Sequence, residues 1–218
     1  TTPLGIQVTN PASASLSLID IGLPLEELSW QYRFDTLAAE VQVIDFHTAL
    51  LGGKLSIPSA LYNSTKDRQQ VDVVLADLRV DSLVNLVEYP GLEADGLISG
   101  YIPLIIEDDT ISIEKGLISA LKPGGSIRYM PDNSTSSSNS SLQLVNNALS
   151  NYQYQTMNTE VFYFEDGELL LNVQLQGSNP DMNNGQPINL NVNIIDHIPS
   201  LLKSLQASRV ITEELERF

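Results

Sequence analysis

The chain has 218 residues, of which 42% are hydrophobic, 6% aromatic and 17% charged, and its formal net charge is −16. This length and hydrophobic content exclude general disorder and suit one large β domain or two small ones. The negative charge argues against binding to nucleic acid and against electrostatic docking on anionic membranes, because both need a cationic surface.

The first part of the chain, as far as Val87, predicts mainly strands, because apolar and polar side chains alternate along it. A short helical turn is expected at residues 23–28, where Pro24 suits a first helical position and acidic residues follow. A two-turn helix is expected at residues 81–87, with Asp81 as its N-cap. The expected strands cover residues 4–18, 30–34, 39–46, 50–58 with a turn at a glycine pair, and 71–75.

The middle of the chain predicts a compact set of short strands and then a polar loop. The loop, residues 131–141, is rich in Ser and Asn and is expected to be mobile. A helix is expected at residues 142–150, because Leu142, Val145 and Leu149 recur at helical spacing. The expected strands cover residues 96–106, 110–113, 116–121, 126–130 and 159–164.

Residues 168–195 predict an antiparallel hairpin around which we expect the rest of the chain to be organised. Its arms are residues 168–176 and 188–194, and the segment between them is rich in Gly, Asn and Pro. Because successive strand side chains point to opposite faces, one face of the hairpin is apolar and the other is rich in amides. The apolar face consists of Leu169, Leu171, Val173, Leu175, Ile188, Leu190, Val192 and Ile194.

The segment after the hairpin predicts a short amphipathic helix at residues 199–205, with Ile198, Leu201, Leu202 and Leu205 in its apolar stripe. An acidic tail, residues 208–218, follows it. The whole chain predicts one β-rich domain of mainly β class. We expect an extended, twisted antiparallel sheet or a half-open β-barrel with a groove, together with two or three short helices. Because the chain lacks an initiator Met and a signal peptide, we expect it to be a piece of a longer protein.

No motif in the chain predicts catalysis, a metal or a cofactor. Cysteine is absent, which excludes disulfides and thiolate metal sites, and the two histidines, His47 and His197, fall on separate elements. No apolar run reaches the roughly 20 residues that cross a bilayer. A carbohydrate-active β-sandwich would need two carboxylates roughly 5 to 10 Å apart in a cleft. The chain offers such acids but, beyond Trp30 and scattered tyrosines, no aromatic platform.

Two blocks of sequence resemble the C-terminal region of the YdbH family of AsmA-like, TamB-like proteins of Gram-negative bacteria, which also carries a "dicarboxylate transport" label. The resemblance covers roughly residues 70–210, and the second block is the more specific. The residues that carry it are 96–104 (GLISGYIPL) and 116–129 (GLISALKPGGSIRY) in the first block, and 166–171 (DGELLL), 175–181 (LQGSNPD), 184–193 (NGQPINLNVN) and 198–205 (IPSLLKSL) in the second.

The resemblance implies a large periplasmic protein, anchored in the inner membrane by an N-terminal helix that is not in this chain. Its long, half-open β-sheet would carry phospholipid toward the outer membrane in a hydrophobic groove. The C-terminal end of such proteins would engage a small outer-membrane lipoprotein by strand addition. No enzymatic activity, nucleic-acid partner or cofactor is implied.

Two hypotheses follow for the apolar face of the hairpin. In the first, it lines a lipid groove, since each buried methylene gains about 0.8 kcal/mol and one acyl chain gains on the order of 10 kcal/mol before opposing costs. In the second, the chain is an interaction cap whose sheet edge recruits a partner strand, and the same residues are ordinary protein core. The alternation indicates that the apolar face is covered. The cover is lipid in the first hypothesis and protein in the second.

Overall fold

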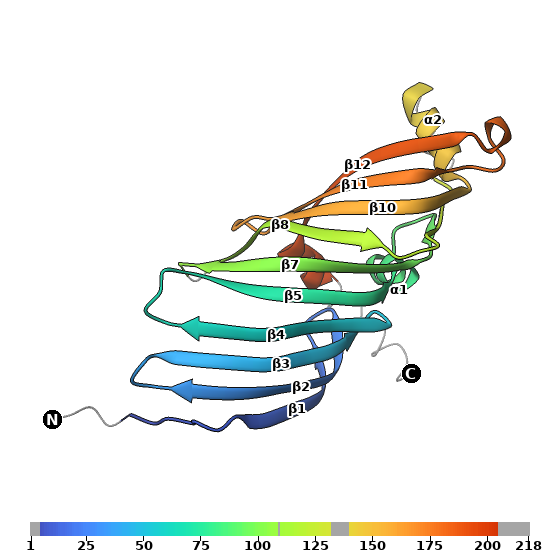
Figure 1. The fold of residues 1–218 in the computed structure, drawn as a ribbon. Helices are drawn as coiled ribbons and strands as arrows, with labels where there is room; N and C mark the ends of the chain where they lie inside the picture. Colours follow the sequence, from blue (N-terminus) through green and yellow to red (C-terminus); the bar gives the residue numbers. More distant parts are fainter. Residues whose placement is uncertain (1–4, 109, 132–139, 205–218) are drawn as a thin grey trace, which may run out of the picture.

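The computed structural model describes residues 5–108, 110–131 and 140–204, which form one open antiparallel sheet of twelve strands (Figure 1). The expected mainly β class is therefore confirmed, and the sheet is not closed into a barrel. The strands are β1 (Ala12–Asp20), β2 (Pro24–Asp35), β3 (Glu40–Leu50), β4 (Gly53–Asn63), β5 (Arg68–Arg79), β6 (Leu92–Ala94), β7 (Leu97–Glu107), β8 (Thr110–Ala120), β9 (Gly125–Tyr129), β10 (Tyr152–Tyr163), β11 (Glu168–Ser178) and β12 (Pro187–His197). The helical elements are α1 (Val80–Val87), α2 (Ser140–Leu149), the 3-10 turn η2 (Asn183–Gly185) and a helix over residues 198–204.

The strands lie in the sheet almost in chain order, β1-β2-β3-β4-β5-β7-β8-β10-β11-β12. Two short strands lie off this path, because β9 pairs with both β6 and the start of β10. Within the described part of the chain, β1 and β12 each pair on one side only. These two edges therefore present unpaired backbone N–H and C=O groups.

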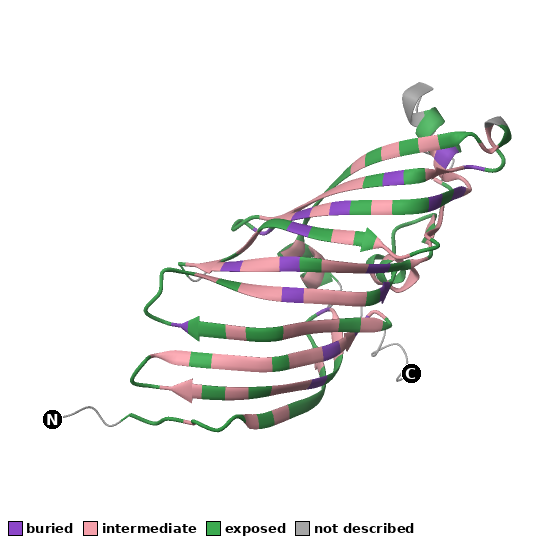
Figure 2. Cartoon of the chain, in the orientation of Figure 1, coloured by how far each residue is buried: buried purple, intermediate pink, exposed green. Residues whose placement is uncertain are grey.

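The two faces of the sheet differ in chemistry. Val73 on β5, Ile102 on β7 and Val161 on β10 are buried and pack together on one side, which we call the inner face. Asp72 and Tyr101 point to the opposite, outer face, where the Tyr101 hydroxyl donates a 2.6 Å hydrogen bond to the Asp72 carboxylate. This alternation explains the striping of buried and exposed residues along β10, β11 and β12 (Figure 2).

Gly116 on β8 allows the sheet to curve around its inner face. A Cβ built on Gly116 would lie 2.6 Å from Cδ1 of Ile102 and 3.2 Å from Cβ of Val161. Ile102 and Val161 belong to the strands on either side of β8, so their side chains meet over a backbone without one. A glycine inside a strand is typical of such a close approach.

The turn between β1 and β2 folds over the inner face. Leu23 in this turn and Leu25 at the start of β2 pack against a buried cluster of Leu50, Leu78 and Ile98. Leu78 and Ile98 belong to β5 and β7, which are not neighbours of β2 in the sheet. The turn (dark blue) accordingly lies behind the central strands in Figure 1.

The helical turn expected at residues 23–28 is wrong. β2 begins at Pro24, pairs with β1 as far as Tyr32, and pairs with β3 over most of its length. Proline is compatible with the first residue of a strand, and Leu28 is buried, with 3% of its surface exposed. Strand pairing and burial therefore override the local helix signal at Pro24.

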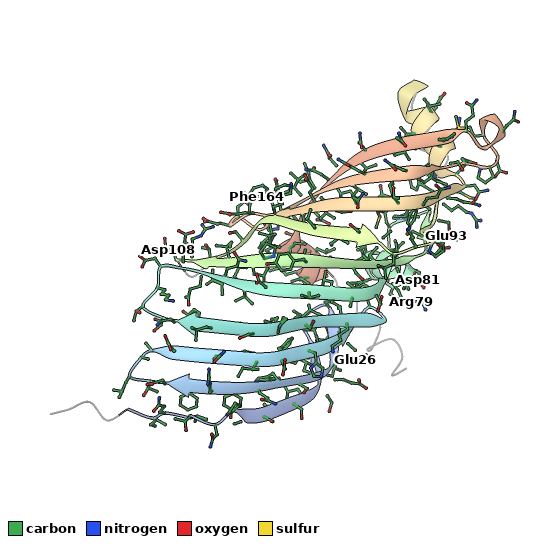
Figure 3. The ribbon with its side chains drawn as sticks, in the orientation of Figure 1. Glu26, Arg79, Asp81, Glu93, Asp108 and Phe164 are labelled. Carbon is green, nitrogen blue, oxygen red and sulfur yellow. The ribbon has the colours of Figure 1, made fainter. Side chains whose placement is uncertain are left out.

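The expected N-cap of the first helix is also wrong. α1 begins at Val80, so its N-cap is Arg79, which makes no side-chain capping bond. Asp81 lies in the first turn, and its carboxylate accepts a 2.6 Å hydrogen bond from Nη2 of Arg79. Figure 3 shows the two side chains beside each other. The acid expected to cap the helix is instead paired with the residue that precedes it.

Most strands are longer than their sequence patterns predict, and in β8 and β10 the difference changes the expected division into elements. β8 continues through Lys115, where a break between two strands is expected, because Lys115 points outward and forms an ion pair with Glu160 on β10. β10 begins at Tyr152, well before the expected start at Thr159. Tyr152 and Tyr154 are buried against Leu175, so this end of β10 is part of the core.

The strand expected at residues 4–18 begins only at Ala12, as β1, and the remaining expected elements that the structure describes are present with shifted bounds. α2 matches the helix expected at residues 142–150, and β11 and β12 form the expected hairpin. The last expected helix is present over residues 198–204, while Leu205 and the acidic tail lie outside the described residues. The loop expected at residues 131–141 also falls mostly outside them.

Candidate functional site

Strand register brings the eight predicted residues onto one face of the β11–β12 pair. Leu171 lies opposite Ile194, Val173 opposite Val192, and Leu175 opposite Leu190. Leu169 lies opposite Asp196 and Ile188 opposite Gly177, both in the same register. Leu171 and Val173 also pair with Val161 and Thr159 of β10, so this surface continues into the inner face of the whole sheet.

One end of this surface is protein core. Leu175 is 3% exposed and packs with the buried rings of Tyr152 and Tyr154. Around this cluster lie half-buried side chains from β9, from α2 and from both arms of the hairpin. They include Ile127, Leu149, Val173, Ile188 and Leu190. At this end the apolar side chains are covered by other parts of the chain.

The other end of the surface is more accessible. Leu169 and Leu171 are half-buried against the cluster around Val161. Val192 is half-buried, and Ile194 is 46% exposed although it shares the inner face with Leu171. The accessible apolar surface of the hairpin therefore lies near the turn between β10 and β11.

Two tyrosines fix the covered end. The Tyr152 hydroxyl donates a 2.7 Å hydrogen bond to the Ile188 carbonyl, and the Tyr154 hydroxyl donates a 2.6 Å hydrogen bond to the Asp95 carbonyl. Burial raises the pKa of Tyr154 to about 12, with a further contribution from the charge of Asp95. Burial also raises the pKa of Tyr152. Both hydroxyls therefore remain neutral donors at physiological pH.

The outer face is held by polar pairs between neighbouring strands. Hydrogen bonds from Tyr101 and then Gln70 hold the pKa of the Asp72 carboxyl below its usual value. The pKa of Glu160 is also lowered, through its hydrogen bond with Lys115. These groups satisfy one another at the surface, so the outer face needs no apolar cover.

A hollow lies at the opposite edge of the sheet, where neither sequence hypothesis places a site. Its volume is about 690 Å³, and it is lined by residues of the paired strands β1 and β2. Its lining includes Leu16 and Leu18, which are among the exposed large apolar residues of the chain. The sequence signal that could have indicated it is the alternation of these leucines with serines along β1.

The helix at residues 198–204, which we call the strap, lies across the inner face (dark red in Figure 1). Its Ile198, Leu201 and Leu202 are half-buried, as the expected apolar stripe predicts, whereas Lys203 and Ser204 are exposed. A Cβ built on Gly22, in the β1–β2 turn, would lie 3.3 Å from Cδ2 of Leu202. The strap therefore connects the end of edge strand β12 to the turn that follows edge strand β1. Sequence patterns do not reveal this contact.

The two histidines have separate local roles. His47 approaches the carbonyl of Asp45 at 3.1 Å, while His197 lies at the start of the strap. Among the described residues, no group of three or more His, Cys, Asp or Glu side chains is placed to hold a metal ion. A search of the same residues for a helix long and apolar enough to cross a membrane finds none.

Comparison with known proteins gives a family match over nearly the whole chain. The family model described as "YdbH-like: Intermembrane phospholipid transport protein YdbH" matches residues 2–218. No curated protein and no solved structure matches the chain. The family match includes the residues before about position 70, where the sequence blocks carry no resemblance, so it covers every strand of the sheet.

Proposed function

We propose that this chain, which belongs to the YdbH-like family of intermembrane phospholipid transport proteins, holds phospholipid acyl chains against the inner face of its sheet. In this proposal it is the C-terminal part of a bridge-like hydrophobic groove, with no enzymatic step. The parent protein would work in the periplasm, with an inner-membrane anchor carried by another part of it.

The observation that carries the proposal is the polarity of a single curved sheet. Its inner face is apolar from β4 to β12, and at Val192 and Ile194 this apolar surface is still partly accessible. Covering it with acyl chain would gain roughly 25 cal/mol for each Å² of apolar surface removed from water. The outer face also exposes apolar side chains such as Ile195, but there they lie among amides and paired charges.

The negative charge of the chain also favours binding through acyl chains and not through head groups. With a net charge of −16, the surface repels anionic head groups, so affinity would rest on acyl chains. Acyl chains bind without directional hydrogen bonds, which suits transport of lipids that share tails and differ in head group. Of the eight residues of the β11–β12 surface, the four at its accessible end, Leu169, Leu171, Val192 and Ile194, are the proposed contacts, because Leu175 and its neighbours are covered by protein.

Site-specific photocrosslinking tests the proposal. A benzophenone amino acid placed at Val192 or Ile194 should capture phospholipid in cells, and mass spectrometry of the adduct would identify it. The same amino acid at Asn191 or Asn193, which point to the outer face of the same strand, is the matched control. Equal labelling of both faces, or none at Val192 and Ile194, would contradict the proposal.

A second candidate function is an interaction cap, favoured by the open edge at β12. Ile195 is 64% exposed on the outer face of that edge strand, beside the exposed Ile194 of the inner face. A partner strand could pair with the edge and cover both residues. A small outer-membrane lipoprotein is the partner that the family resemblance suggests.

Strand addition can be tested with proline. Alternate N–H groups of β12 point toward β11 and toward the open edge. Proline at an edge-directed position should abolish capture of the lipoprotein from outer-membrane extracts while leaving the sheet folded. Deleting residues 208–218 tests the acidic tail in the same assay, and unchanged capture would remove the tail from this hypothesis.

A further inference from the structure

We propose that the strap is a movable cover of the inner face, which pivots at His197 and closes by the contact of Leu202 with Gly22. Closed, it bridges the open sheet between the β12 end and the β1–β2 turn. Opened, it uncovers the inner face. The identity of the ligand rests on the proposed function, whereas the movement of the strap does not.

The pivot end of the strap is held by hydrogen bonds. The Ile198 amide donates a 3.0 Å hydrogen bond to the Gly167 carbonyl, in the turn between β10 and β11. One ring nitrogen of His197, Nε2, lies 3.0 Å from the Asp166 carbonyl, which can only accept, so Nε2 carries the proton. A Cβ on Gly167 would lie 2.9 Å from Cδ and Cγ of Pro199, so the first turn of the strap packs closely on this loop.

His197 also caps the strap. Its other ring nitrogen, Nδ1, lies 3.3 Å from the Ser200 amide, which donates to it, and 2.8 Å from the Ser200 hydroxyl. A side-chain acceptor for the third helical amide is the standard arrangement of an N-cap. The strap is therefore ordered from its pivot and does not depend on the far contact for its first turn.

The closing end of the strap is a close approach of Leu202 to the backbone of Gly22. The Leu202 carbonyl oxygen and Cδ2 would lie 3.0 and 3.3 Å from a Cβ on Gly22, and Gly22 has a φ of +95°, so the tight approach and the backbone conformation both favour glycine here. Leu23, the next residue, packs with Leu78 and Ile98 on the inner face. The strap thus closes onto a turn that itself packs on the inner face, and a contact limited to Leu202 and Gly22 can separate at low cost.

A reversible crosslink tests the movement. Because the chain has no cysteine, a pair made by Ile21→Cys and Lys203→Cys carries the only thiols. Both positions are exposed and flank the Gly22–Leu202 contact. Joining them with a short reducible bis-maleimide holds the strap closed, and each single-cysteine variant treated in the same way is the control.

Access to the inner face is then measured with Nile red, a neutral apolar dye. We expect uptake by the linked protein to be about tenfold slower than by the same protein after reduction. The opposite change, Leu202→Ser, should speed uptake, while Lys203→Ser on the exposed side of the strap should not. Equal uptake in the linked and reduced states would overturn the proposal.

Phospholipid release to vesicles of neutral lipid, measured on the same samples, separates the two proposals. If no variant carries phospholipid but linking still slows Nile red uptake, the strap proposal stands and the lipid proposal fails. If phospholipid is bound and leaves at the same rate whether or not the strap is linked, the lipid proposal stands and the strap proposal fails.

Discussion

The hydroxyl of Tyr154 on β10 donates a 2.6 Å hydrogen bond to the carbonyl of Asp95, which immediately precedes the Gly96 that leads into β7. Glycines make this contact possible, since a Cβ on Gly96 or Gly125 would lie 2.3 or 2.5 Å from the same hydroxyl. Tyr154 thus ties the covered end of the inner face to a loop far away in the chain.

Removing this hydroxyl should destabilise the fold. Tyr154 is 2% exposed, so Tyr154→Phe keeps the ring but leaves the Asp95 carbonyl without its donor. We expect the free energy of unfolding in urea to fall by about 1 to 2 kcal/mol. Tyr101→Phe removes a hydroxyl of equal hydrogen-bond length from the exposed outer face and should cost less. Equal losses of unfolding free energy in the two variants would contradict a special role for the buried Tyr154 hydroxyl.

The same tyrosine should make stability fall at alkaline pH. In the unfolded chain Tyr154 ionises near pH 10, whereas in the folded chain its pKa is about 12. Between these values the unfolded chain releases the proton first, so the stability contributed below pH 10 is lost as pH rises to about 12. The loss amounts to about 3 kcal/mol at most. Urea titrations of wild type and Tyr154→Phe across this range should diverge, and parallel curves would refute the expectation.

A side chain at Gly116 should clash with a specific atom. Gly116→Ala places a Cβ 2.6 Å from Cδ1 of Ile102, and overpacking of this kind costs about 1 to 3 kcal/mol. Ile102→Val removes that Cδ1 atom and alone costs about 1 kcal/mol. We expect the double variant to be more stable than the sum of the two single losses. Simple additivity in urea unfolding would show that the two residues do not compete for space.

Charge on the inner face should abolish lipid binding without unfolding the sheet. Ile194→Asp places a carboxylate on the accessible part of that face, where burial by an acyl chain would strip its water. Ile195→Asp is the matched control, because the neighbouring residue is exposed on the outer face. We expect co-purified phospholipid, measured by mass spectrometry, to be lost from the first variant only. Retention in both would exclude Ile194 from the lipid surface.

The N-cap of the strap can be tested by exchanging one acceptor for another. His197→Ala removes the acceptor for the Ser200 amide and should destabilise the strap by about 0.5 to 2 kcal/mol. His197→Asn retains an acceptor at the cap and should preserve most of that stability. Hydrogen exchange of the amides in residues 198–204 reports this local change better than global unfolding does. Identical exchange in the two variants would exclude the capping role.

The hairpin could be predicted from sequence because its signal is purely local. Ile188, Leu190, Val192 and Ile194 alternate with asparagines without interruption, and β12 contains the whole expected arm and extends beyond it to His197. The start of β10 could not be predicted in the same way. Its pairing shifts register between Tyr154 and Thr156, which interrupts the simple alternation around two buried tyrosines.

The errors at Pro24 and Lys115 have another cause. Proline followed by two acids is equally compatible with the start of a helix and the start of a strand, and only pairing with β1 and β3 decides between them. Lys115 and Glu160 are 45 residues apart, so sequence alone does not show that they neutralise each other on adjacent strands. The contact of Leu202 with Gly22 is more distant still and depends on the curvature of the whole sheet.

The near-sequential order of strands has a consequence for biogenesis. Each strand of the main path except β7 pairs with the strand that directly precedes it in the chain, and β10 pairs with both β9 and β8. Contacts of this kind are quick to form. A chain delivered N-terminus first could therefore add its strands to the sheet one after another. At every stage two edges would be unpaired, that of β1 and that of the strand added most recently, and the strap would follow β12.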